Sequence, residues 1–534
     1  MGMYLNPGNE GFVGITRSDY VDKTGLIGVI NRSIGTSSKL TCISRPRRFG
    51  KSYAAQMLCA YYDKSCDSRE LFLPYQIAQD DTFETHLNQY NVIYLDMTNL
   101  LEKVLPENLT LFIKEKVTEE IRKEYPEVDA NDTFDETLLN VVEYSGRKFI
   151  MIIDEWDSPI RENPEIEKTY LTFLRMLFKS SNITPKIFAA AYMTGILPIK
   201  KNGSQSAISD FREYTILNAG PFAEYTGFTE PEVRRLCEEK GLDFSMAKAW
   251  YDGYTVGDQH SVYNPYSMMM AVSSRRFTSY WKKTSAAEAL ITYIDMDEEG
   301  LQEDVARLIA GEMIEVDPDG FQNDFVTFSN KDDVLTLMIH LGYLSYEEET
   351  DSYGGISGGR SFGYVRIPNE EIRIEFDQIL RRAKHKDLIR LVQLSDRLLQ
   401  DTLAGEEEKV ARAFTAVRDS AYAPTFYNDE QGLRYVIRFA YLSCVDQYAR
   451  VEEMPTGHGI ADVVFVPKRR SALPAMIVEL KWNKTADEAI EQIIDRNYPA
   501  ALKGYGGEIV VVGINYDTET KQHTCRIDRV DYRS

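Results

Sequence analysis

One stretch of nine residues, Ser44-Arg45-Pro46-Arg47-Arg48-Phe49-Gly50-Lys51-Ser52, constrains the fold of this chain more than any other. It follows the apolar run Leu40–Ile43 and leads into Tyr53–Leu58, which we expect to be helical. A strand, a tight turn and a helix in this order are the setting of a phosphate-binding loop, where backbone N–H groups at the helix N-terminus point at a phosphate. A basic turn before a surface helix is the plainer alternative, because Arg45 replaces the first glycine of the full signature.

The loop residues have distinct expected roles in binding ATP. We expect Lys51 to reach the terminal phosphates and the Ser52 hydroxyl to ligate Mg²⁺. The other loop residues that we expect to contact the nucleotide are Arg47, Arg48, Phe49 and Gly50.

A second run favours the same interpretation. Lys148–Glu155 is an apolar strand that ends in two carboxylates, Asp154 and Glu155. Ligands bind at the carboxyl ends of buried parallel strands. We therefore expect Asp154 to hold Mg²⁺ through water, and Glu155 to orient and deprotonate an attacking water. A strand followed by a polar turn is the alternative for this run alone.

The chain resembles the AAA-ATPase-like proteins of bacteria that carry a PD-(D/E)xK nuclease-like domain at the C-terminus. Arg45 is normal in that family, whereas Trp156 stands where the family more often has Tyr. The resemblance covers nearly the whole chain. Besides the loop, it rests on Tyr20–Thr24, Ile153–Ile160, Thr194–Leu197, Trp250–Tyr254 and Val262–Pro265.

The resemblance also suggests a role for the end of another strand. Lys186–Thr194 is a buried run, and Thr194 stands where such ATPases have a polar residue that senses the γ-phosphate. A threonine that merely ends a strand is an equal alternative. An arginine finger is expected too, and Arg161, Arg175 and Arg212 are candidates that the sequence cannot rank.

The composition predicts an ordinary multidomain globular protein. The chain has 534 residues, of which 43% are hydrophobic and 27% charged, enough for two to four domains. No apolar run approaches the length of a membrane span, and the first residues lack the form of a signal peptide, so no membrane association is expected. Six cysteines without paired spacing indicate a reducing, cytoplasmic location.

The net charge of −22 argues against a protein that coats nucleic acid generally. A local DNA site remains compatible with it, because salt screens exposed charges beyond about 8 Å.

Strands that alternate with helices predict an α/β fold. Residues 1–226 are expected to form a P-loop, AAA-like core, with a parallel sheet covered by helices on both faces and strands that include 91–96 and 214–217. Residues 227–400 are expected to form a helical lid and a winged-helix-like module, and residues 405–534 a small α/β PD-(D/E)xK nuclease-like domain.

The winged-helix-like module is read from a helix followed by two strands. Val334–Ile339 is the expected helix, and Tyr343–Tyr346 and Tyr364–Ile367 are the expected strands, joined by the glycine-rich loop Gly354–Gly359. Such a module can bind DNA or serve only as a packing domain.

The C-terminal part contains a second group of charged residues. Asp462 lies on the strand Gly459–Phe465, and Glu479 and Lys481 lie on the next one and leave the same face of it, since strand side chains alternate by two. Asp462 and Glu479, with Glu430 as a third candidate, supply the oxygen ligands that Mg²⁺ prefers. Lys481 can position the attacking water or stabilise charge on the scissile phosphate.

This spacing is the PD-(D/E)xK pattern, and Gln492 and Tyr498 match family positions on the following helix. A hairpin with charges alternating outward is the alternative.

Together these patterns predict an ATP-hydrolysing protein whose nucleotide cycle controls a C-terminal Mg²⁺-dependent DNA endonuclease-like domain. Two alternatives stay open. One is an ATP-driven switch whose catalytically inactive nuclease-fold tail binds nucleic acid or a protein partner, and the other is a nucleotide-binding scaffold without turnover. The expected ligands are ATP, Mg²⁺ and DNA, and a homo-oligomer is compatible with the sequence.

Overall fold

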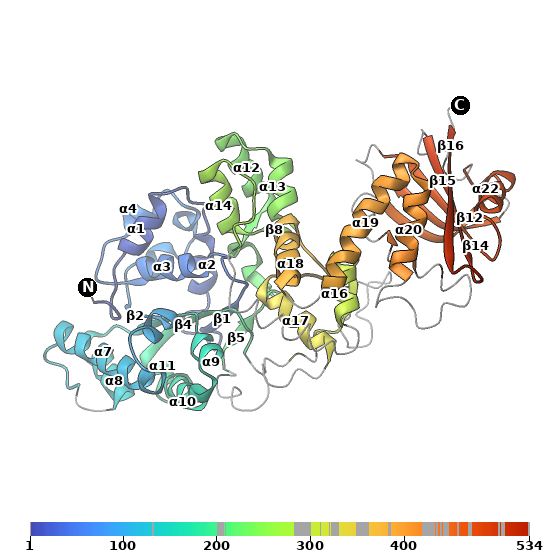
Figure 1. Cartoon of the computed structure of the whole chain (residues 1–534). Helices are drawn as coiled ribbons and strands as arrows, with labels where there is room; N and C mark the ends of the chain where they lie inside the picture. The colour runs from blue at the N-terminus through green and yellow to red at the C-terminus, as the bar shows by residue number, and fades with distance from the viewer. Residues whose placement is uncertain are drawn as a thin grey trace. The chain divides into compact units, whose positions relative to one another are not determined.

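In the computed structural model of the chain (Figure 1), the apolar runs of the first part form a five-stranded sheet in the order β2-β3-β4-β1-β5. Every strand pair in it is parallel. β1, β3 and β4 are buried along their whole length, which explains why their sequences lack polar alternation. The strands are β1 (Leu40–Ser44), β2 (Asn91–Asp96), β3 (Phe149–Asp154), β4 (Phe188–Gly195) and β5 (Arg212–Tyr214).

The structure describes residues 2–130, 133–199, 208, 210–281, 301–309, 311–319, 321, 330–348, 363–382, 386–418, 433, 436–437, 440–441, 448–456, 459–467, 473–499, 502 and 508–531. The chain divides into two compact units, residues 1–283 with 315–372, and residues 284–314 with 373–534. The predicted core and most of the predicted lid therefore share the first unit, and the finer three-part division stays a prediction. Within the described residues, every helix is too short or too polar to span a membrane.

Helices cover both faces of the parallel sheet (Figure 1). Side chains of β3 alternate between two cores, Ile150 and Ile152 with α1, α2 and α3, and Met151 and Ile153 with α7, α8 and α10. This confirms the predicted α/β fold. The helices are α1 (Glu10–Thr16), α2 (Gly25–Asn31), α3 (Lys51–Tyr62), α7 (Leu109–Glu124), α8 (Phe134–Ser145) and α10 (Glu167–Phe178), with the short helices α4 (Arg69–Phe72), α5 (Phe83–His86), α6 (Met97–Leu101), α9 (Ser158–Glu162) and α11 (Thr184–Ile187).

The fifth strand is shifted from its predicted place. β5 pairs with β1 from Arg212 to Tyr214, whereas the apolar residues 214–217 had suggested a strand that starts later. The chain leaves the sheet after Tyr214 because a turn follows, in which the Asn218 N–H donates to Thr215 Oγ1 at 3.2 Å.

A helical lid follows the sheet, as predicted. Its first helix, α12 (Glu230–Lys240), begins with a capping box formed by Thr229 and Glu232 and has proline in its first turn. The other lid elements are α13 (Phe244–Tyr251), α14 (Pro265–Ser274) and a small sheet in the order β6-β8-β7, made of β6 (Phe228–Thr229), β7 (Tyr254–Val256) and β8 (Gln259–Tyr263).

The Trp250–Tyr254 motif packs against the start of α18 (Glu370–Arg382). Gly253 has a φ of +101°, and a Cβ there would lie 2.0 Å from the Pro368 carbonyl oxygen, so only glycine allows this approach. Beside it, Asn369 Nδ2 donates to the Asp252 carbonyl at 2.7 Å. The motif therefore ties the lid to the segment that follows the wing.

The predicted helix and two-stranded wing are present. α17 (Lys331–Leu341) is followed by β10 (Ser345–Glu348) and its antiparallel partner β11 (Gly363–Arg366), and β9 (Ile314–Val316) extends this sheet in the order β10-β11-β9. The glycine-rich loop between the two wing strands lies outside the described residues.

The C-terminal unit contains a mixed five-stranded sheet in the order β12-β13-β14-β15-β16. β14 and β15 are parallel and the other pairs antiparallel. α20 packs in the core on one face of this sheet and α22 in the core on the other. The elements are α16 (Leu301–Ile309), α19 (Lys386–Ala404), α20 (Glu407–Arg418), β12 (Tyr448–Thr456), β13 (Gly459–Pro467), β14 (Ala475–Trp482), α22 (Ala486–Asp495), β15 (Glu508–Asp517) and β16 (Gln522–Asp531).

Candidate nucleotide site and candidate metal centre

Two residues of the loop between β1 and α3 have a left-handed backbone conformation, one of them a glycine and the other an arginine. Gly50 has a φ of +87° and is the N-cap of α3, and Arg48 has a φ of +71°. Left-handed backbone is uncommon for a residue other than glycine. The loop thus reverses the chain so that Lys51 and Ser52 occupy the first turn of α3, where the N–H groups have no partner within the helix.

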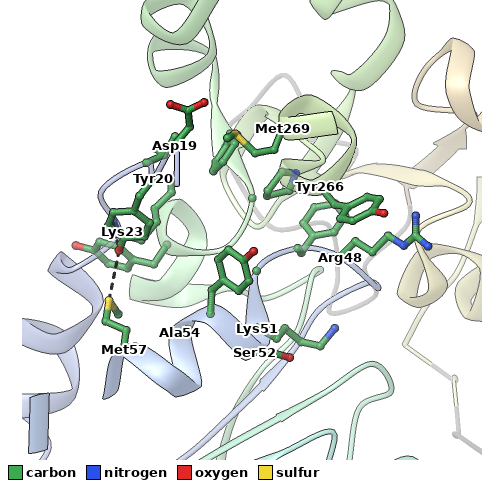
Figure 2. A pocket seen from close by; sticks show the side chains of 18 of the residues that line it. Asp19, Tyr20, Lys23, Arg48, Lys51, Ser52, Ala54, Met57, Tyr266 and Met269 are labelled. Atoms are coloured by element: carbon green, nitrogen blue, oxygen red, sulfur yellow. Dashed lines mark hydrogen bonds between the residues drawn. The ribbon is translucent and has the colours of Figure 1, made fainter. Parts of the chain in front are cut away.

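A cavity of about 250 Å³ opens over this helix start. Figure 2 shows Lys51 and Ser52 below it, and Tyr20 and Tyr266 among the side chains that line it. Of the predicted nucleotide ligands, Arg48, Phe49, Gly50, Lys51 and Ser52 line the cavity, whereas Arg47 and Thr194 do not.

Lys51 is held by the loop itself. Its Nζ donates to the Arg45 carbonyl at 3.1 Å and to the Pro46 carbonyl at 2.9 Å, and lies 4.0 Å from Glu155 Oε1. The side chain is 4% exposed. Burial lowers the pKa of Lys51, against the opposing charges of Glu155 and Asp154. Neutral carbonyls are weak partners for an ammonium, so this lysine is available to a phosphate.

Asp154, Ser52 and Thr194 meet at the end of β3. Thr194 Oγ1 donates to Asp154 Oδ1. Asp154 is 2% exposed, and this burial raises its pKa, whereas the nearby Ser52 hydroxyl favours the ionised form of the Asp154 carboxylate and so opposes the rise. Parallel pairing brings these residues together, since β3 lies beside β4 and β4 lies beside β1. A buried carboxylate next to a hydroxyl fits a magnesium ligand.

Glu155, the next residue, is surrounded by cations. It has ion pairs with Lys51 at 4.0 Å and with Arg161 Nη2 at 3.4 Å. Burial alone would raise the pKa of Glu155, but the charges of Lys51, Arg161 and Arg47 together keep it below its usual value. An ionised carboxylate at the cavity wall can accept a proton from water.

The three candidate arginine fingers have different surroundings in the structure. Arg161, on α9, contacts Glu155, whereas Arg175 on α10 and Arg212 on β5 are exposed. The cavity also has walls from the segment around Tyr20 and Lys23 and from Met269 of the lid. Sequence reasoning did not assign those residues to the site, because only the tertiary fold brings them to the loop.

Arg45, which replaces the first glycine of the loop signature, is a buried brace. Its guanidinium donates to Thr226 Oγ1 at 2.8 Å, to the Ser44 carbonyl at 2.9 Å and to the Tyr214 carbonyl at 2.8 Å. Arg45 is fully buried, and burial lowers its pKa to about 10. The residue joins the loop to β5 and to the chain that enters the lid.

Two further loop residues contact the lid. The Arg48 guanidinium lies 4.4 Å from the centre of the Tyr266 ring, and the two side chains lie together in Figure 2. The Phe49 carbonyl accepts the Gly227 N–H at 3.2 Å, and its ring meets Tyr254 edge-on at 5.1 Å. Lid side chains therefore pack against Arg48 and Phe49, whereas glycines at these two positions would leave that space empty.

The predicted C-terminal residues also lie together. β13 and β14 are antiparallel, with Val463 opposite Val478. Asp462 Oδ2 accepts the Leu480 N–H at 2.9 Å, which fixes Asp462 beside the strand that carries Glu479 and Lys481.

Gln492 of α22 completes this group. Lys481 Nζ donates to Glu479 Oε1 at 3.2 Å and to Gln492 Oε1 at 2.9 Å. The Gln492 amide donates to Glu479 Oε1 and lies 3.0 Å from the Tyr498 hydroxyl, which in turn donates to the Ile460 carbonyl at 2.9 Å. Gln492 and Tyr498 thus hold the lysine and the carboxylate in place.

Glu479 has one oxygen to offer a cation. Its side chain is 3% exposed, and Oε2 is buried without a hydrogen-bond partner in the described part of the chain. Burial first, and the charge of Asp462 second, raise the pKa of Glu479 to about 7. A buried oxygen without a partner is costly unless a ligand uses it, so the residues present fit a divalent cation.

The described residues supply two carboxylates for that cation, Asp462 and Glu479. No group of three or more His, Cys, Asp or Glu with metal-binding geometry occurs among the described residues. The third predicted ligand, Glu430, lies outside them.

Two family models match this chain. Residues 8–204 match the model described as Predicted AAA-ATPase, and residues 428–525 match the one described as PD-(D/E)XK nuclease superfamily. The predicted resemblance, an AAA-ATPase-like domain followed by a C-terminal nuclease-superfamily domain, is therefore confirmed.

Among known proteins, the chain is 22% identical over 520 residues to the "Uncharacterized protein in vnfD 5'region" of Azotobacter chroococcum mcd 1, covering 94% of this chain and 93% of that protein. Among solved structures, the Aeropyrum pernix ORC2 protein in its ADPNP-ADP complexes is 10% identical, with 69% of this chain and 93% of that chain covered and a TM-score of 0.28. Drosophila ORC bound to AT-rich DNA and Cdc6 is 9% identical, with 69% and 98% covered and a TM-score of 0.19. These TM-scores are too low to inform function.

We predict that Arg45→Gly, which restores the first glycine of the signature, destabilises the nucleotide-binding unit by about 2–4 kcal/mol. The Tyr214 carbonyl and Thr226 would lose charged donors, and a cavity would open. Calorimetric melting measures the effect, with the exposed Arg175→Ala as the control. Equal melting temperatures for Arg45→Gly and the wild type would contradict the bracing role.

We predict that Glu479→Gln raises the melting temperature of the metal-free protein at pH 8. The folded-state pKa of Glu479, about 7, is above the unfolded value of about 4.3. The resulting loss of stability therefore builds up between about pH 4.3 and about pH 7, is complete above pH 7, and is only a small part of its full size at pH 5. We expect the free energy of unfolding to rise by only about 1–2 kcal/mol, because Lys481 loses the charge of its partner and this offsets part of the gain. Melting in chelator at pH 8 and pH 5 tests this against exposed Glu488→Gln, and a gain that is equal at both pH values would refute it.

Proposed function

We propose that this chain hydrolyses ATP in its AAA-ATPase-like domain and cleaves DNA in its nuclease-superfamily domain, with the nucleotide cycle controlling cleavage. The observation that carries the ATPase proposal is that Lys51, Ser52, Asp154 and Glu155 come together where α3 begins and β3 ends, and that all of them except Asp154 line the cavity. The first residue can hold phosphate, the next two a cation and the last a water. The same four residues were the strongest candidates from the sequence.

Each residue has a separate task in the proposed ATPase reaction. Lys51 exchanges its loop carbonyls for phosphate oxygens, which carry full charge and bind an ammonium more strongly. Ser52 and Asp154 would hold Mg²⁺, which neutralises charge on the phosphates. The Glu155 carboxylate accepts the proton of the attacking water. The Thr194 hydroxyl, which donates a hydrogen bond to Asp154 in the structure, is the proposed sensor of the terminal phosphate.

The proposed nuclease reaction uses the second group. Asp462 and Glu479, with Glu430 as a third ligand, would hold Mg²⁺, which activates water and stabilises charge on the phosphodiester. Lys481, steadied by Gln492, donates to the attacking water or to the phosphate oxygen that gains charge. The unpartnered Glu479 Oε2 is the observation that carries this half of the proposal.

A second candidate function is an ATP-driven switch whose tail binds nucleic acid or a partner without cutting. It differs from the first proposal in that the tail does not cut nucleic acid in the presence of a divalent metal. A further alternative, a nucleotide-binding scaffold, differs from both in releasing no phosphate at steady state. DNA as the substrate, a cytoplasmic location and a homo-oligomer are also proposals.

For the ATPase, we predict that Lys51→Ala abolishes nucleotide binding or hydrolysis, because the phosphates lose their paired charge. Glu155→Gln should keep binding and lower kcat about 10²–10⁴-fold, since a carboxamide cannot accept the proton. Phosphate release and titration with a fluorescent ATP analogue measure the two effects. The controls are Lys116→Ala and Glu119→Gln, which remove an exposed pair on α7. Wild-type hydrolysis by Glu155→Gln would show that the base is another group.

For the nuclease, we predict that Asp462→Ala and Glu479→Ala each eliminate Mg²⁺- or Mn²⁺-dependent cleavage by removing a ligand. Lys481→Ala should bind metal almost normally and cut slowly, because the lysine acts electrostatically. The assay uses plasmid, linear and single-stranded DNA, with and without ATP, and exposed Lys409→Ala and Glu408→Ala as controls. If the wild type cuts nothing and Asp462→Ala loses no metal binding, the tail is a binding module.

A further inference from the structure

Glu155 has a strained backbone that its surroundings must maintain. Its φ is +54°, a left-handed conformation that costs a residue other than glycine about 1–2 kcal/mol. The Glu155 N–H donates to Thr194 Oγ1 at 3.4 Å, and the next N–H, that of Trp156, donates to the Thr194 carbonyl at 2.8 Å. The turn after β3 is therefore fastened to the end of β4.

Gly195 leaves room for this turn. A Cβ at that position would lie 2.6 Å from Trp156 Nε1 and 2.8 Å from Asp157 Oδ1. Both separations are below any normal contact, so a larger residue would push the Glu155–Asp157 turn away from β4. Because the turn approaches Gly195 so closely, the Asp157 carboxylate lies next to the backbone segment that follows β4.

Asp157 is anchored on that backbone. Its side chain is 3% exposed, and its oxygens accept the N–H of Ile196 at 3.3 Å and of Leu197 at 3.1 Å. Asp157 Oδ2 also pairs with Arg161 Nη1 at 2.7 Å. A buried carboxylate with this many donors is fixed in position.

Arg161 links the fixed Asp157 carboxylate to Glu155. Its side chain is 12% exposed, and while Nη1 is on Asp157, Nη2 lies 3.4 Å from Glu155 Oε2. The planar guanidinium can hold two carboxylates at once in a set geometry. Lys51 lies near Glu155 too, at 4.0 Å, but on the proposed function it moves to the phosphates. Arg161 then remains in its ion pair with the Glu155 carboxylate, with the charge of Arg47 nearby.

We propose that Asp157 and Arg161 are positioning residues that hold the Glu155 carboxylate toward the attacking water, so that Arg161 acts on hydrolysis through Glu155 and not by touching phosphate. This inference rests on the proposed ATPase function and deepens it. Of the two roles open to Arg161, the contacts favour positioning over an arginine finger, because one side of the guanidinium is on Asp157 and the other on Glu155.

The test compares kcat, KM and the Kd of a fluorescent ATP analogue for the full-length chain. We expect Arg161→Ala to lower kcat about 10²-fold, as misplacement of a reacting group does, with Kd and KM within about threefold of the wild type. Arg161→Lys, which can hold one carboxylate but not two, should recover part of kcat. Asp157→Asn should also lower kcat, and Arg235→Ala, which removes an exposed arginine on α12, is the matched control.

The double variant Arg161→Ala with Glu155→Gln distinguishes the two roles of Arg161. If Arg161 acts through Glu155, the double variant hydrolyses ATP no more slowly than Glu155→Gln alone, because the effects are not additive. A further fall of tenfold or more would show that Arg161 acts on phosphate and would overturn the inference. So would an unchanged kcat in a folded Arg161→Ala protein. The proposed function fails separately, if Glu155→Gln hydrolyses ATP at the wild-type rate, and the inference then fails with it.

Discussion

The candidate nucleotide site depends on a cation that is fully buried, Arg45. Burying an arginine is expensive unless its donors are satisfied. Nε and Nη1 of Arg45 donate to the hydroxyl of Thr226 and to the carbonyls of Ser44 and Tyr214, whereas Nη2 is buried without a hydrogen-bond partner among the described residues. Since these acceptors belong to β1, the end of β5 and the entry to the lid, the loop can form only when all three are in place. A glycine at position 45 would free the loop from this requirement.

The same constraint explains how this loop keeps its conformation although it contains few glycines. In a glycine-rich loop, flexible backbone wraps the ligand, whereas here Arg48 stacks on Tyr266 and Phe49 packs on Tyr254. The lid therefore holds the loop open over the helix start before a ligand arrives. Preorganisation of this kind lowers the entropy lost on binding.

The sequence predicts those parts of the molecule that local patterns encode. Continuous apolar runs predicted β3 and β4, and the i, i+2 spacing of Glu479 and Lys481 predicted that they share a face, because both depend on the strand repeat alone. β5 was misplaced, since apolar residues continue past the turn at Thr215. The role of Arg161 could not be ranked, because its partner Asp157 is fixed by the backbone of a strand far away in the sequence.

Both groups pair a lysine with a carboxylate in the same way. Lys51 lies beside Glu155 and Lys481 beside Glu479, and in each pair the lysine is nearly buried. Within each pair the opposite charges offset each other, which lowers the cost of burying them. On the proposed function, the lysine of each pair turns to a phosphate, and a divalent cation balances the carboxylates nearby. The two sites would then share one principle, a phosphate and a divalent cation that bind together, with nucleotide in one unit and phosphodiester in the other.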